Sequence, residues 1–322
     1  MDNMKIGLRL PQTDEHRATK ENIIRLTKEV ENAGFDSLWV LERLIWPINP
    51  SDPYAGTTDG KFPADWQYIF EPLETLTYVA ANTNKIALGT SVIDMLFHNP
   101  VVLARRFATL DVLSEGRSIA GFGIGWSQDE YQASNIPFQN RGKRADEFIQ
   151  VLKRIWTDDV VEFKGKYYSI PASKIAPKPL QKPHPPIYMG GFSPNTFSRI
   201  VNYDTNGWLA VTAGPLEYLD NTIKNIKDIA NKANKDPNNF KVILLAHLNV
   251  DLDLKSQSIT KVNEGQRFPF TGTIDQIGDD IKRIKQMDMD VDHIVFGYNF
   301  IPLGRNVDKM LDITKQLAKF AR

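Results

Sequence analysis

Apolar residues recur along this chain with two different spacings. Residues 5–10 alternate between apolar and small or polar side chains, and residues 23–33 then place apolar side chains three or four positions apart, up to Gly34. Alternation is typical of a half-buried strand, and the wider spacing is typical of an amphipathic helix that ends at a glycine cap. The chain therefore opens with a strand that is followed by a helix.

The same two patterns repeat to the end of the 322 residues. Strict alternation of strands and helices predicts a parallel sheet with right-handed crossovers, and a count of eight favours a closed barrel over an open sheet. We therefore predict an α/β fold, a single (β/α)8 TIM barrel. The predicted strands are residues 5–10, 37–41, 85–90, 119–125, 186–189, 207–211, 240–250 and 293–296, and the predicted helices are residues 23–33, 72–82, 101–114, 144–156, 194–203, 216–233, 274–287 and 307–320.

Three insertions interrupt the repeat, after strands 2, 4 and 7. Residues 46–67 are rich in Pro, Gly, Trp and Tyr, and we expect them to form a lid or pocket wall on the catalytic rim. Residues 159–183 predict a hairpin that turns at Gly165, followed by a proline-rich connector, and residues 251–269 are polar. Because no linker separates these parts, residues 1–322 are predicted to form one domain.

The balance of charges narrows the range of partners. There are 39 Lys and Arg residues against 39 Asp and Glu residues, so no general attraction to nucleic acid or to an anionic membrane is expected. The absence of cysteine excludes disulfides, thiolate metal sites and cysteine nucleophiles. No apolar run is long enough to span a bilayer, and the early first strand leaves no room for a signal peptide. We expect a soluble, cytoplasmic protein.

Glycine occupies every second position at the end of the fourth predicted strand. Gly121, Gly123 and Gly125 leave one face of that strand bare. A bare face either makes room for a flat ligand or allows close packing against a neighbouring strand or helix. A dinucleotide-binding G-x-G-x-x-G motif is set aside, because Trp126 holds the position of its last glycine.

Seven short motifs follow one another in a distinctive order. They are ERLIWP (42–47), LGTSV (88–92), HNP (98–100), LDVLSEGR (110–117), GFGIGWSQDEY (121–131), RGKRADE (141–147) and PPIYMGGFS (185–193). Together they resemble the bacterial luciferase-like family, and within it the subgroup of probable F420-dependent oxidoreductases. The resemblance implies a (β/α)8 barrel that binds a flavin or deazaflavin at its C-terminal rim.

The same resemblance implies an activity. We expect hydride transfer between the deazaflavin F420 and a small organic substrate. The alternatives are an FMN-dependent monooxygenase, which uses reduced flavin and molecular oxygen, and a non-catalytic flavin-binding subunit. Because relatives are commonly dimers, a homodimer is expected.

The resemblance also implies which residues bind the cofactor. The turn after the fifth strand is expected to bind the cofactor phosphate, because Ser193 and Pro194 form a favourable helix start and glycines let a phosphate approach the backbone. A non-prolyl cis peptide at Ser91–Val92 is expected behind the central ring. The implied cofactor-binding residues are Thr90, Ser91, Val92, Gly125, Trp126, Ser127, Gly190, Gly191, Phe192 and Ser193.

Glu42 and Arg9 are the predicted catalytic residues. Strand alternation directs Arg9 into the barrel, where its guanidinium needs an anionic partner from the protein, the cofactor or the substrate. Glu42 is either a general base or substrate anchor, or the structural ion-pair partner of Arg43. Arg43 stands where some F420-dependent dehydrogenases have a catalytic histidine, and arginine cannot act as a base.

Aromatic and imidazole side chains complete the predicted site. Asp129 and Glu130 are interpreted as solvated acids in the first turn of a helix, with a helix cap as the alternative for Glu130. No metal site is predicted, because no carboxylate accompanies a histidine at ligand spacing. The predicted substrate-pocket residues are Trp46, Trp66 and His98.

Overall fold

The computed structural model describes residues 4–57, 59–250, 261–263, 266–287, 289–298 and 306–321. Its main strands hydrogen-bond in the order β3-β2-β1-β15-β10-β9-β8-β5, and a further pairing of β5 with β3 closes the ring. The described residues thus contain a closed, eight-stranded parallel β-barrel, which confirms the predicted fold class. Its strands are β1 (Lys5–Arg9), β2 (Ser37–Val40), β3 (Ala87–Thr90), β5 (Ser118–Gly123), β8 (Ile187–Gly190), β9 (Gly207–Val211), β10 (Lys241–His247) and β15 (Val291–Gly297).

Every predicted helix is present, and the helix ends agree with the sequence pattern to within three residues. The apolar pattern does not show the short helix α4 (Gln128–Ala133), because six residues are too few for an apolar repeat, but the interpretation of Asp129 and Glu130 as first-turn residues of a helix is confirmed. The apolar pattern also missed the two-residue strand β4 (Ile93–Asp94). The predicted helices are α1 (Lys20–Asn32), α2 (Pro72–Ala80), α3 (Pro100–Leu113), α5 (Arg141–Thr157), α6 (Pro194–Asn202), α7 (Leu216–Lys232), α8 (Ile274–Gln286) and α9 (Val307–Ala321).

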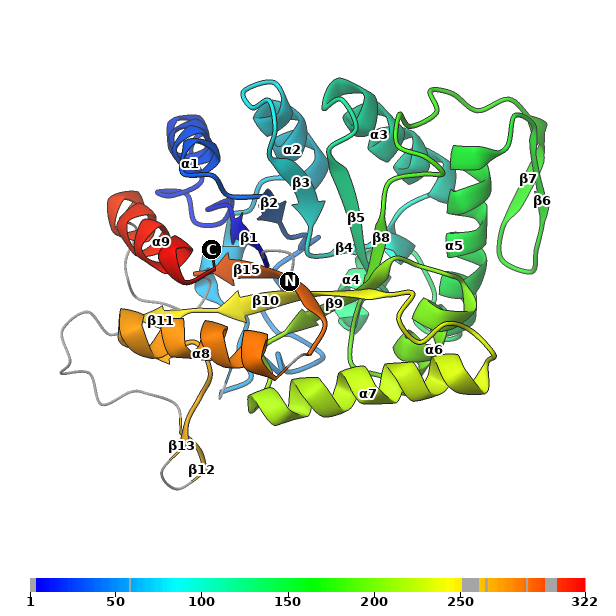
Figure 1. The fold of residues 1–322 in the computed structure, drawn as a ribbon. Helices are drawn as coiled ribbons and strands as arrows, with labels where there is room; N and C mark the ends of the chain where they lie inside the picture. The colour runs from blue at the N-terminus through cyan, green and yellow to red at the C-terminus, as the bar shows by residue number, and fades with distance from the viewer. Residues whose placement is uncertain are drawn as a thin grey trace. The chain divides into compact units, whose positions relative to one another are not determined.

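The chain divides into two compact units. The first unit comprises residues 1–11, 21–39 and 191–322, and the second comprises residues 12–20 and 40–190. In the first unit, β10 pairs with β9 on one side and with β15 on the other, and β15 also pairs with β1. Helix α6 packs against α7, and α8 packs against α9 (Figure 1).

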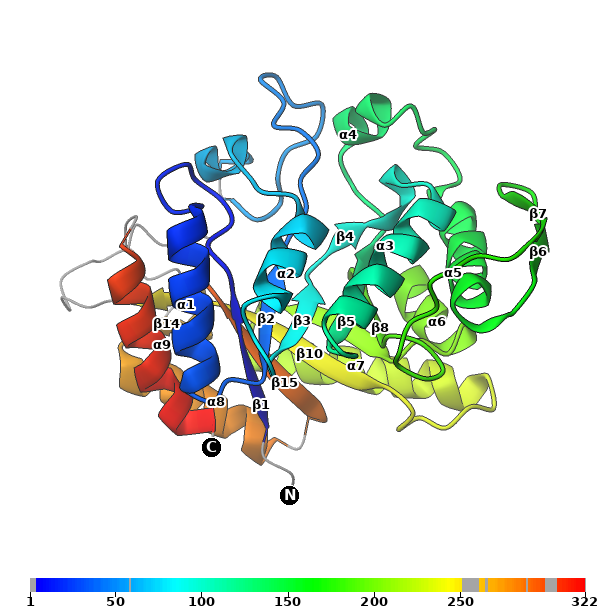
Figure 2. The ribbon, with the colours of Figure 1, turned by 90° about the horizontal axis from the view of Figure 1, so that it is seen from above.

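In the second unit, β5 is the central strand and pairs with β3, β4 and β8. Helix α3 packs against both α2 and α5 (Figure 2). The predicted hairpin is confirmed: β6 (Val161–Lys164) pairs antiparallel with β7 (Ser169–Ser173) around Gly165. Its turn is tied to α5, because the carboxylate of Glu147 accepts the N–H groups of Lys166 and Tyr167, each over 2.8 Å.

The polar insertion predicted at residues 251–269 is only partly described. Strand β12 (Lys261–Asn263) pairs antiparallel with β13 (Gln266–Arg267), and residues 251–260, 264 and 265 lie outside the described residues. Strands β11 (Asn249–Val250) and β14 (Thr271–Gly272), on either side of the insertion, pair with each other. Over the ranges that the structure describes, no helix has the length and apolar character needed to cross a membrane.

Gly207 allows a test of the tight strand pairing in the first unit. It lies opposite Lys241 in the β9–β10 ladder, and a Cβ at this position would overlap the backbone oxygen of Lys241. We expect Gly207→Ala to lower the free energy of unfolding by at least about 3 kcal/mol, because backbone atoms cannot rotate away as a side chain can. Urea denaturation measures this change.

Gly214→Ala is the matched control. The nearest atom to a Cβ at Gly214 would be 3.7 Å away, which is an ordinary van der Waals contact. Its free energy of unfolding should stay within about 0.5 kcal/mol of the wild-type value. Equal stability of the two variants would contradict the overlap at Gly207.

Candidate active site

Strand β5 makes room for a carboxylate of the protein itself. A Cβ on Gly123 would overlap the carboxylate of Asp94 and would lie 2.7 Å from Cγ2 of Val92. Gly125 has a left-handed φ of 72°, and its N–H group donates to Oδ1 of Asp94 over 2.9 Å. Gly123 is therefore required for space and Gly125 for backbone conformation. The glycine pattern was interpreted either as room for a flat ligand or as close packing, and close packing is the correct interpretation at Gly123.

Asp94 is a buried acid with a perturbed pKa. Burial raises the pKa of its carboxyl group to about 6, and the charge of Glu42 adds to this rise. The positive charge of Arg43 and the N–H group of Gly125 oppose it. Asp94 therefore exchanges its proton in a pH range in which an ordinary aspartate is already ionised.

Glu42 and His98 form a hydrogen-bonded pair. Nε2 of His98 lies 2.7 Å from Oε1 of Glu42, and Oε2 of Glu42 accepts the N–H group of Asp94 over 2.8 Å. The side chain of Glu42 is 6% exposed, whereas that of His98 is 20% exposed. A fixed, buried carboxylate thus orients an imidazole that solvent can still reach. Within the described ranges, no three side chains of His, Asp or Glu are grouped as metal ligands would be.

Arg43 pairs with Glu130 and not with Glu42. Nε of Arg43 donates to Oε1 of Glu130 over 3.1 Å, and Nη2 is ion-paired with the second carboxylate oxygen. Oε1 of Glu130 also accepts the N–H group of Leu44 over 2.8 Å. The proposed Glu42–Arg43 ion pair is therefore wrong. The interpretation of Glu130 as a solvated acid is also wrong, because the buried guanidinium of Arg43 requires a buried counter-charge.

The insertion after β2 folds into an aromatic cluster around Arg43. The guanidinium carbon lies 5.3 Å from the ring centroid of Trp126, 5.4 Å from that of Trp66 and 5.8 Å from that of Phe62. The ring of Tyr54 packs against Trp66 and Trp126, with centroid distances of 4.9 and 5.7 Å. Cation–π attraction therefore adds to the ion pair in holding this insertion against the barrel strand that precedes it.

The two tryptophans predicted for the substrate pocket both have packing partners. Trp66 lies in a single 3-10 turn (Ala64–Gln67) and is buried against Arg43. Trp46 donates its indole N–H to the backbone oxygen of Pro63 over 3.1 Å. Both side chains therefore shape the insertion, and their contact with a substrate stays a prediction.

The end of β3 has the non-prolyl cis peptide that was predicted, at Ser91–Val92. The N–H group of Ser91 donates to the backbone oxygen of Val40 over 2.7 Å. The hydroxyl of Thr90 donates to the backbone oxygen of Gly121 over 2.8 Å and accepts the N–H group of Gly121 over 2.9 Å. Thr90 thus joins β3 to β5, which is a structural role for a residue predicted to bind cofactor.

Trp126 and Ser127 follow β5 and differ in accessibility. Ser127 is fully buried and caps α4, where its hydroxyl accepts the N–H group of Glu130 over 3.4 Å. Trp126 is half-buried and packs against Phe62 with a centroid distance of 5.3 Å. Of these two predicted cofactor residues, Trp126 has the side chain that a ligand can reach.

The glycine turn after β8 contains the other predicted cofactor residues. Gly190 ends β8 in the second unit, and Gly191 starts the last segment of the first unit with a φ of 122°. Gly191 and Phe192 are exposed, and Ser193 caps α6 by accepting the N–H group of Thr196 over 3.2 Å. An exposed glycine beside a capped helix start fits a cofactor phosphate, because the backbone N–H groups there can be approached closely.

Arg9 is buried at the end of β1, in the first unit. Burial and the positive charge of Arg9 lower the pKa of His247 to about 3. His247 ends β10 and lies opposite Gly297 of β15. His247 is therefore neutral near pH 7, and Arg9 supplies the positive charge at the ends of these strands. Sequence patterns identified Arg9 and missed His247, which belongs to no motif.

Comparison with known families identifies the chain. The model of the luciferase-like monooxygenase family matches residues 4–256. The chain belongs to the luciferase-like monooxygenase family. The resemblance found in the motifs is confirmed, and the protein is an oxidoreductase of this family. Members of the family use F420 or FMN.

Among relatives in the family is an uncharacterized protein of Mycobacterium tuberculosis. It is 31% identical over 255 residues, which are 77% of this chain and 86% of the relative. An F420-dependent glucose-6-phosphate dehydrogenase of Amycolatopsis mediterranei is 29% identical over 219 residues, which are 66% of this chain and 60% of the relative.

Solved structures with the same fold include both reaction classes of the luciferase-like proteins. The monooxygenase RslO1 from Streptomyces bottropensis has a TM-score of 0.78 at 20% identity, with 98% of each chain covered. An F420-dependent secondary alcohol dehydrogenase in complex with an F420-acetone adduct also has a TM-score of 0.78 at 20% identity, with 99% of each chain covered. At this identity the likeness shows the fold alone.

The raised pKa of Asp94 predicts a pH dependence of the stability of this luciferase-like protein. The native state keeps the proton of Asp94 up to about pH 6, whereas the unfolded chain releases it near the ordinary value of 3.8. The stability that Asp94 contributes is therefore present below about pH 4 and is lost as the pH rises to about 6. We expect Asp94→Asn, which cannot ionise, to gain up to about 3 kcal/mol relative to the wild type between pH 4 and pH 7.

Urea denaturation of both proteins at pH 4 and pH 7 measures this gain. Comparing the variant with the wild type at each pH cancels the contributions of the other titrating groups. A difference in stability that does not change with pH would contradict the raised pKa.

Proposed function

We propose that this luciferase-like protein transfers a hydride between coenzyme F420 and a carbon that carries a hydroxyl or carbonyl oxygen in a small organic substrate. The Glu42–His98 pair is the observation that carries the proposal. Oxidation of an alcohol releases a hydride from carbon and a proton from oxygen, so the reaction needs a proton acceptor in addition to the cofactor. Bound F420 supplies the hydride acceptor.

His98 has the geometry of such a proton acceptor. A carboxylate only accepts hydrogen bonds, so Nε2 of His98 carries the proton that it shares with Glu42. Nδ1 is then the basic nitrogen, and it has no hydrogen-bond partner in the part of the chain that the structure describes. The proton of the substrate hydroxyl passes to Nδ1, and the charge of Glu42 stabilises the imidazolium that forms. In the reverse reaction Nδ1 returns the proton to the substrate oxygen.

Asp94 acts through Glu42. Its N–H group holds Oε2 of Glu42 over 2.8 Å, which leaves Oε1 directed at His98. The backbone N–H group of Glu42 donates to the oxygen of Val92 over 3.2 Å, so the backbone of Glu42 is also held. These contacts keep the imidazole in one orientation, which reduces the entropy cost of reaching the reactive geometry.

The proposal assigns the role of base to His98, because Arg43 cannot act as a base. In relatives with a histidine at the position of Arg43, that histidine is the expected catalytic base, as the motif comparison implies. Here the guanidinium of Arg43 is buried between Glu130 and aromatic rings. His98, a different residue of the same unit, provides the proton acceptor that hydride transfer needs.

The cofactor-binding residues of the proposal are assigned unit by unit. In the first unit, the exposed Gly191 and the start of α6 at Ser193 suit the cofactor phosphate. In the second unit, Gly125, the half-buried Trp126 and the Ser91–Val92 peptide suit the ring system. Oxygen activation with reduced FMN is the alternative activity, and the match to the luciferase-like monooxygenase family model favours it.

Binding of the two cofactors separates these activities. We expect the purified protein to quench the fluorescence of F420 with a dissociation constant in the micromolar range, about 8 kcal/mol of binding free energy. FMN should bind at least about tenfold more weakly, which is about 1.4 kcal/mol. Tight binding of FMN without binding of F420 would refute the proposal.

Substitution of His98 tests the proton acceptor. We expect His98→Gln to lower kcat for F420 reduction by simple secondary alcohols about 10²- to 10⁴-fold, because glutamine cannot take up a proton. The dissociation constant of F420 should not change, because the imidazole is assigned to proton transfer and not to cofactor binding. The measurement is the absorbance of F420 in a stopped-flow spectrometer.

His16→Gln is the matched control for His98→Gln. The side chain of His16 is 57% exposed, and its partner Glu15 is 70% exposed. Its kcat should match that of the wild type. A His98→Gln variant that keeps the wild-type kcat would contradict the assignment of His98 as the proton acceptor.

A further inference from the structure

The carboxyl group of Asp94 is the least compensated of the three buried acids of the second unit. Glu130 is ion-paired with Arg43, and Glu42 is hydrogen-bonded to an imidazole and also accepts a backbone N–H group. Among the described residues, the N–H group of Gly125 is the one donor to the carboxyl group of Asp94, over 2.9 Å. A buried carboxylate needs more donors than this to keep its charge, so the neutral acid suits the site better.

A neutral carboxyl group also needs an acceptor for its own proton. Oδ1 of Asp94 accepts the N–H group of Gly125, so the proton is carried by Oδ2. Oδ2 has no hydrogen-bond partner in the described part of the chain, and it is not sealed from solvent although the residue is only 8% exposed. An O–H donor therefore remains available to a ligand.

Ionisable side chains from the end of β2, the loop before α3 and helix α4 act on this carboxyl group. Burial and the charge of Glu42 raise the pKa of Asp94, and the charges of Arg43 and His98 oppose the rise, which brings the pKa to about 6. Burial and the charge of Asp94 raise the pKa of Tyr131, so that its hydroxyl stays neutral. The protonation of Asp94 therefore changes between about pH 5 and pH 7.

The carboxyl group lies among the residues that suit a cofactor ring. A Cβ on Gly123 would overlap Oδ1 of Asp94 and would lie 2.7 Å from Val92, the second residue of the cis peptide. Gly125, which donates to Oδ1, directly precedes the half-buried Trp126. All these residues belong to the second unit, so their grouping does not depend on the placement of the first unit.

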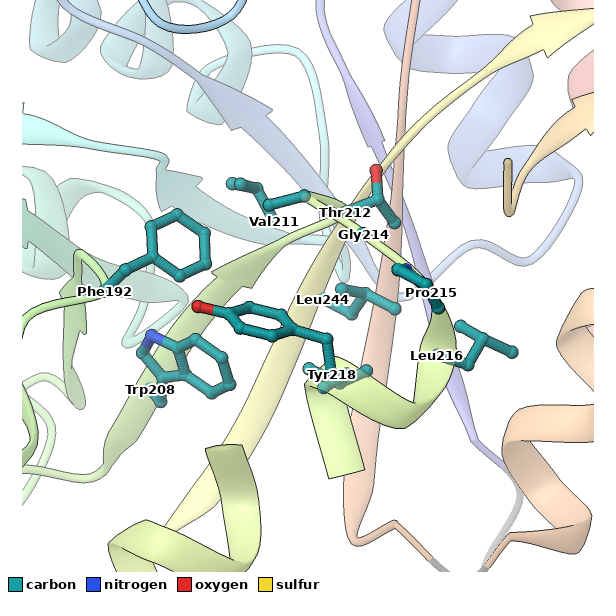
Figure 3. Close-up of a pocket in the computed structure, with 11 residues that line it drawn as sticks. Phe192, Trp208, Val211, Thr212, Gly214, Pro215, Leu216, Tyr218 and Leu244 are labelled. Atoms are coloured by element: carbon teal, nitrogen blue, oxygen red, sulfur yellow. The ribbon is translucent and has the colours of Figure 1, made fainter. Parts of the chain in front are cut away.

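The aromatic residues at the end of β9, in the first unit, do not form a ring site. Phe192, Trp208 and Tyr218 line a hollow there (Figure 3). It has room for about one water molecule, so no planar ring fits into it.

Flavin and deazaflavin rings both carry carbonyl oxygens on either side of an N–H group. A neutral carboxyl group donates to such an oxygen, whereas a carboxylate only accepts from the N–H group. We propose that Asp94 binds the cofactor ring as a neutral acid, with its Oδ2–H group donating to a carbonyl oxygen of the ring. This role rests on the part of the proposed function that assigns the ring to the second unit, and not on the choice between F420 and FMN or on the reaction.

Fluorescence titration of the full chain with F420 and with FMN, at pH 5 and pH 8, tests the role of Asp94. Asp94→Asn is the informative variant, because its amide donates at both pH values. The dissociation constants of the wild type and Asp94→Asn should agree within about threefold at pH 5, where both have the donor. At pH 8 that of the wild type should be at least about tenfold higher, because only a small fraction of Asp94 is still protonated. Comparing the two proteins at each pH cancels the ionisation of the cofactor and of the neighbouring side chains.

Two further variants complete the test. Asp94→Leu has a similar shape without a donor, and at pH 5 it should bind the ring at least about fivefold more weakly than Asp94→Asn. Asp159→Asn is the matched control, because Asp159 lies in the second unit with a side chain that is 84% exposed. It should keep the pH dependence of the wild type. Thermal unfolding of each variant checks that it is folded.

The outcomes separate this role from the proposed function. A wild-type affinity that does not fall relative to Asp94→Asn between pH 5 and pH 8 would overturn the role. A relative affinity that rises would also overturn it, because an ionised Asp94 would then accept the ring N–H group. Binding of FMN alone, with the expected pH dependence, would contradict hydride transfer to F420 and leave the role of Asp94 standing. Binding of neither cofactor would overturn both.

Discussion

Compensation of buried charge is the constraint on which the second unit depends. Glu42, Asp94 and Glu130 bring three carboxyl groups into a region with little or no access to water. A buried carboxylate without partners costs several kcal/mol, so each must meet a specific donor or give up its charge. Glu42 is hydrogen-bonded to His98, and Glu130 is ion-paired with Arg43. Asp94 accepts the N–H group of Gly125, and its raised pKa favours the neutral carboxyl group.

The interactions that compensate these three carboxyl groups are physically linked. The carboxylate of Asp94 occupies the space that Gly123 leaves open, and the backbone of Asp94 orients the carboxylate of Glu42. Glu42 in turn orients His98. The glycine spacing of β5 thus sets the position of the imidazole to which we assign proton transfer. A larger residue at position 123 would displace Asp94 and, through it, the Glu42–His98 pair.

Arg43 organises the other side of the same region. Its ion pair with Glu130 joins the end of β2 to α4, and its guanidinium lies among the rings of the aromatic cluster. Arg43 therefore has a structural role in this region. Phe62 and Trp66 are the buried residues in the described part of the Trp46–Gln67 insertion, and both rings lie against this guanidinium.

The sequence by itself determined the barrel, because apolar periods of 2 and 3.6 residues report local burial, and the helix caps Asn99, Ser193 and Thr273 act within one turn. It also located the Ser91–Val92 peptide through its motif. Only the tertiary structure decided the charge partners. Glu42 and His98 are 56 positions apart, and Arg43 and Glu130 are 87 apart. In the sequence, several carboxylates are candidate partners for each positively charged side chain. Which carboxylate pairs with it is decided only when the strands pair and water is excluded.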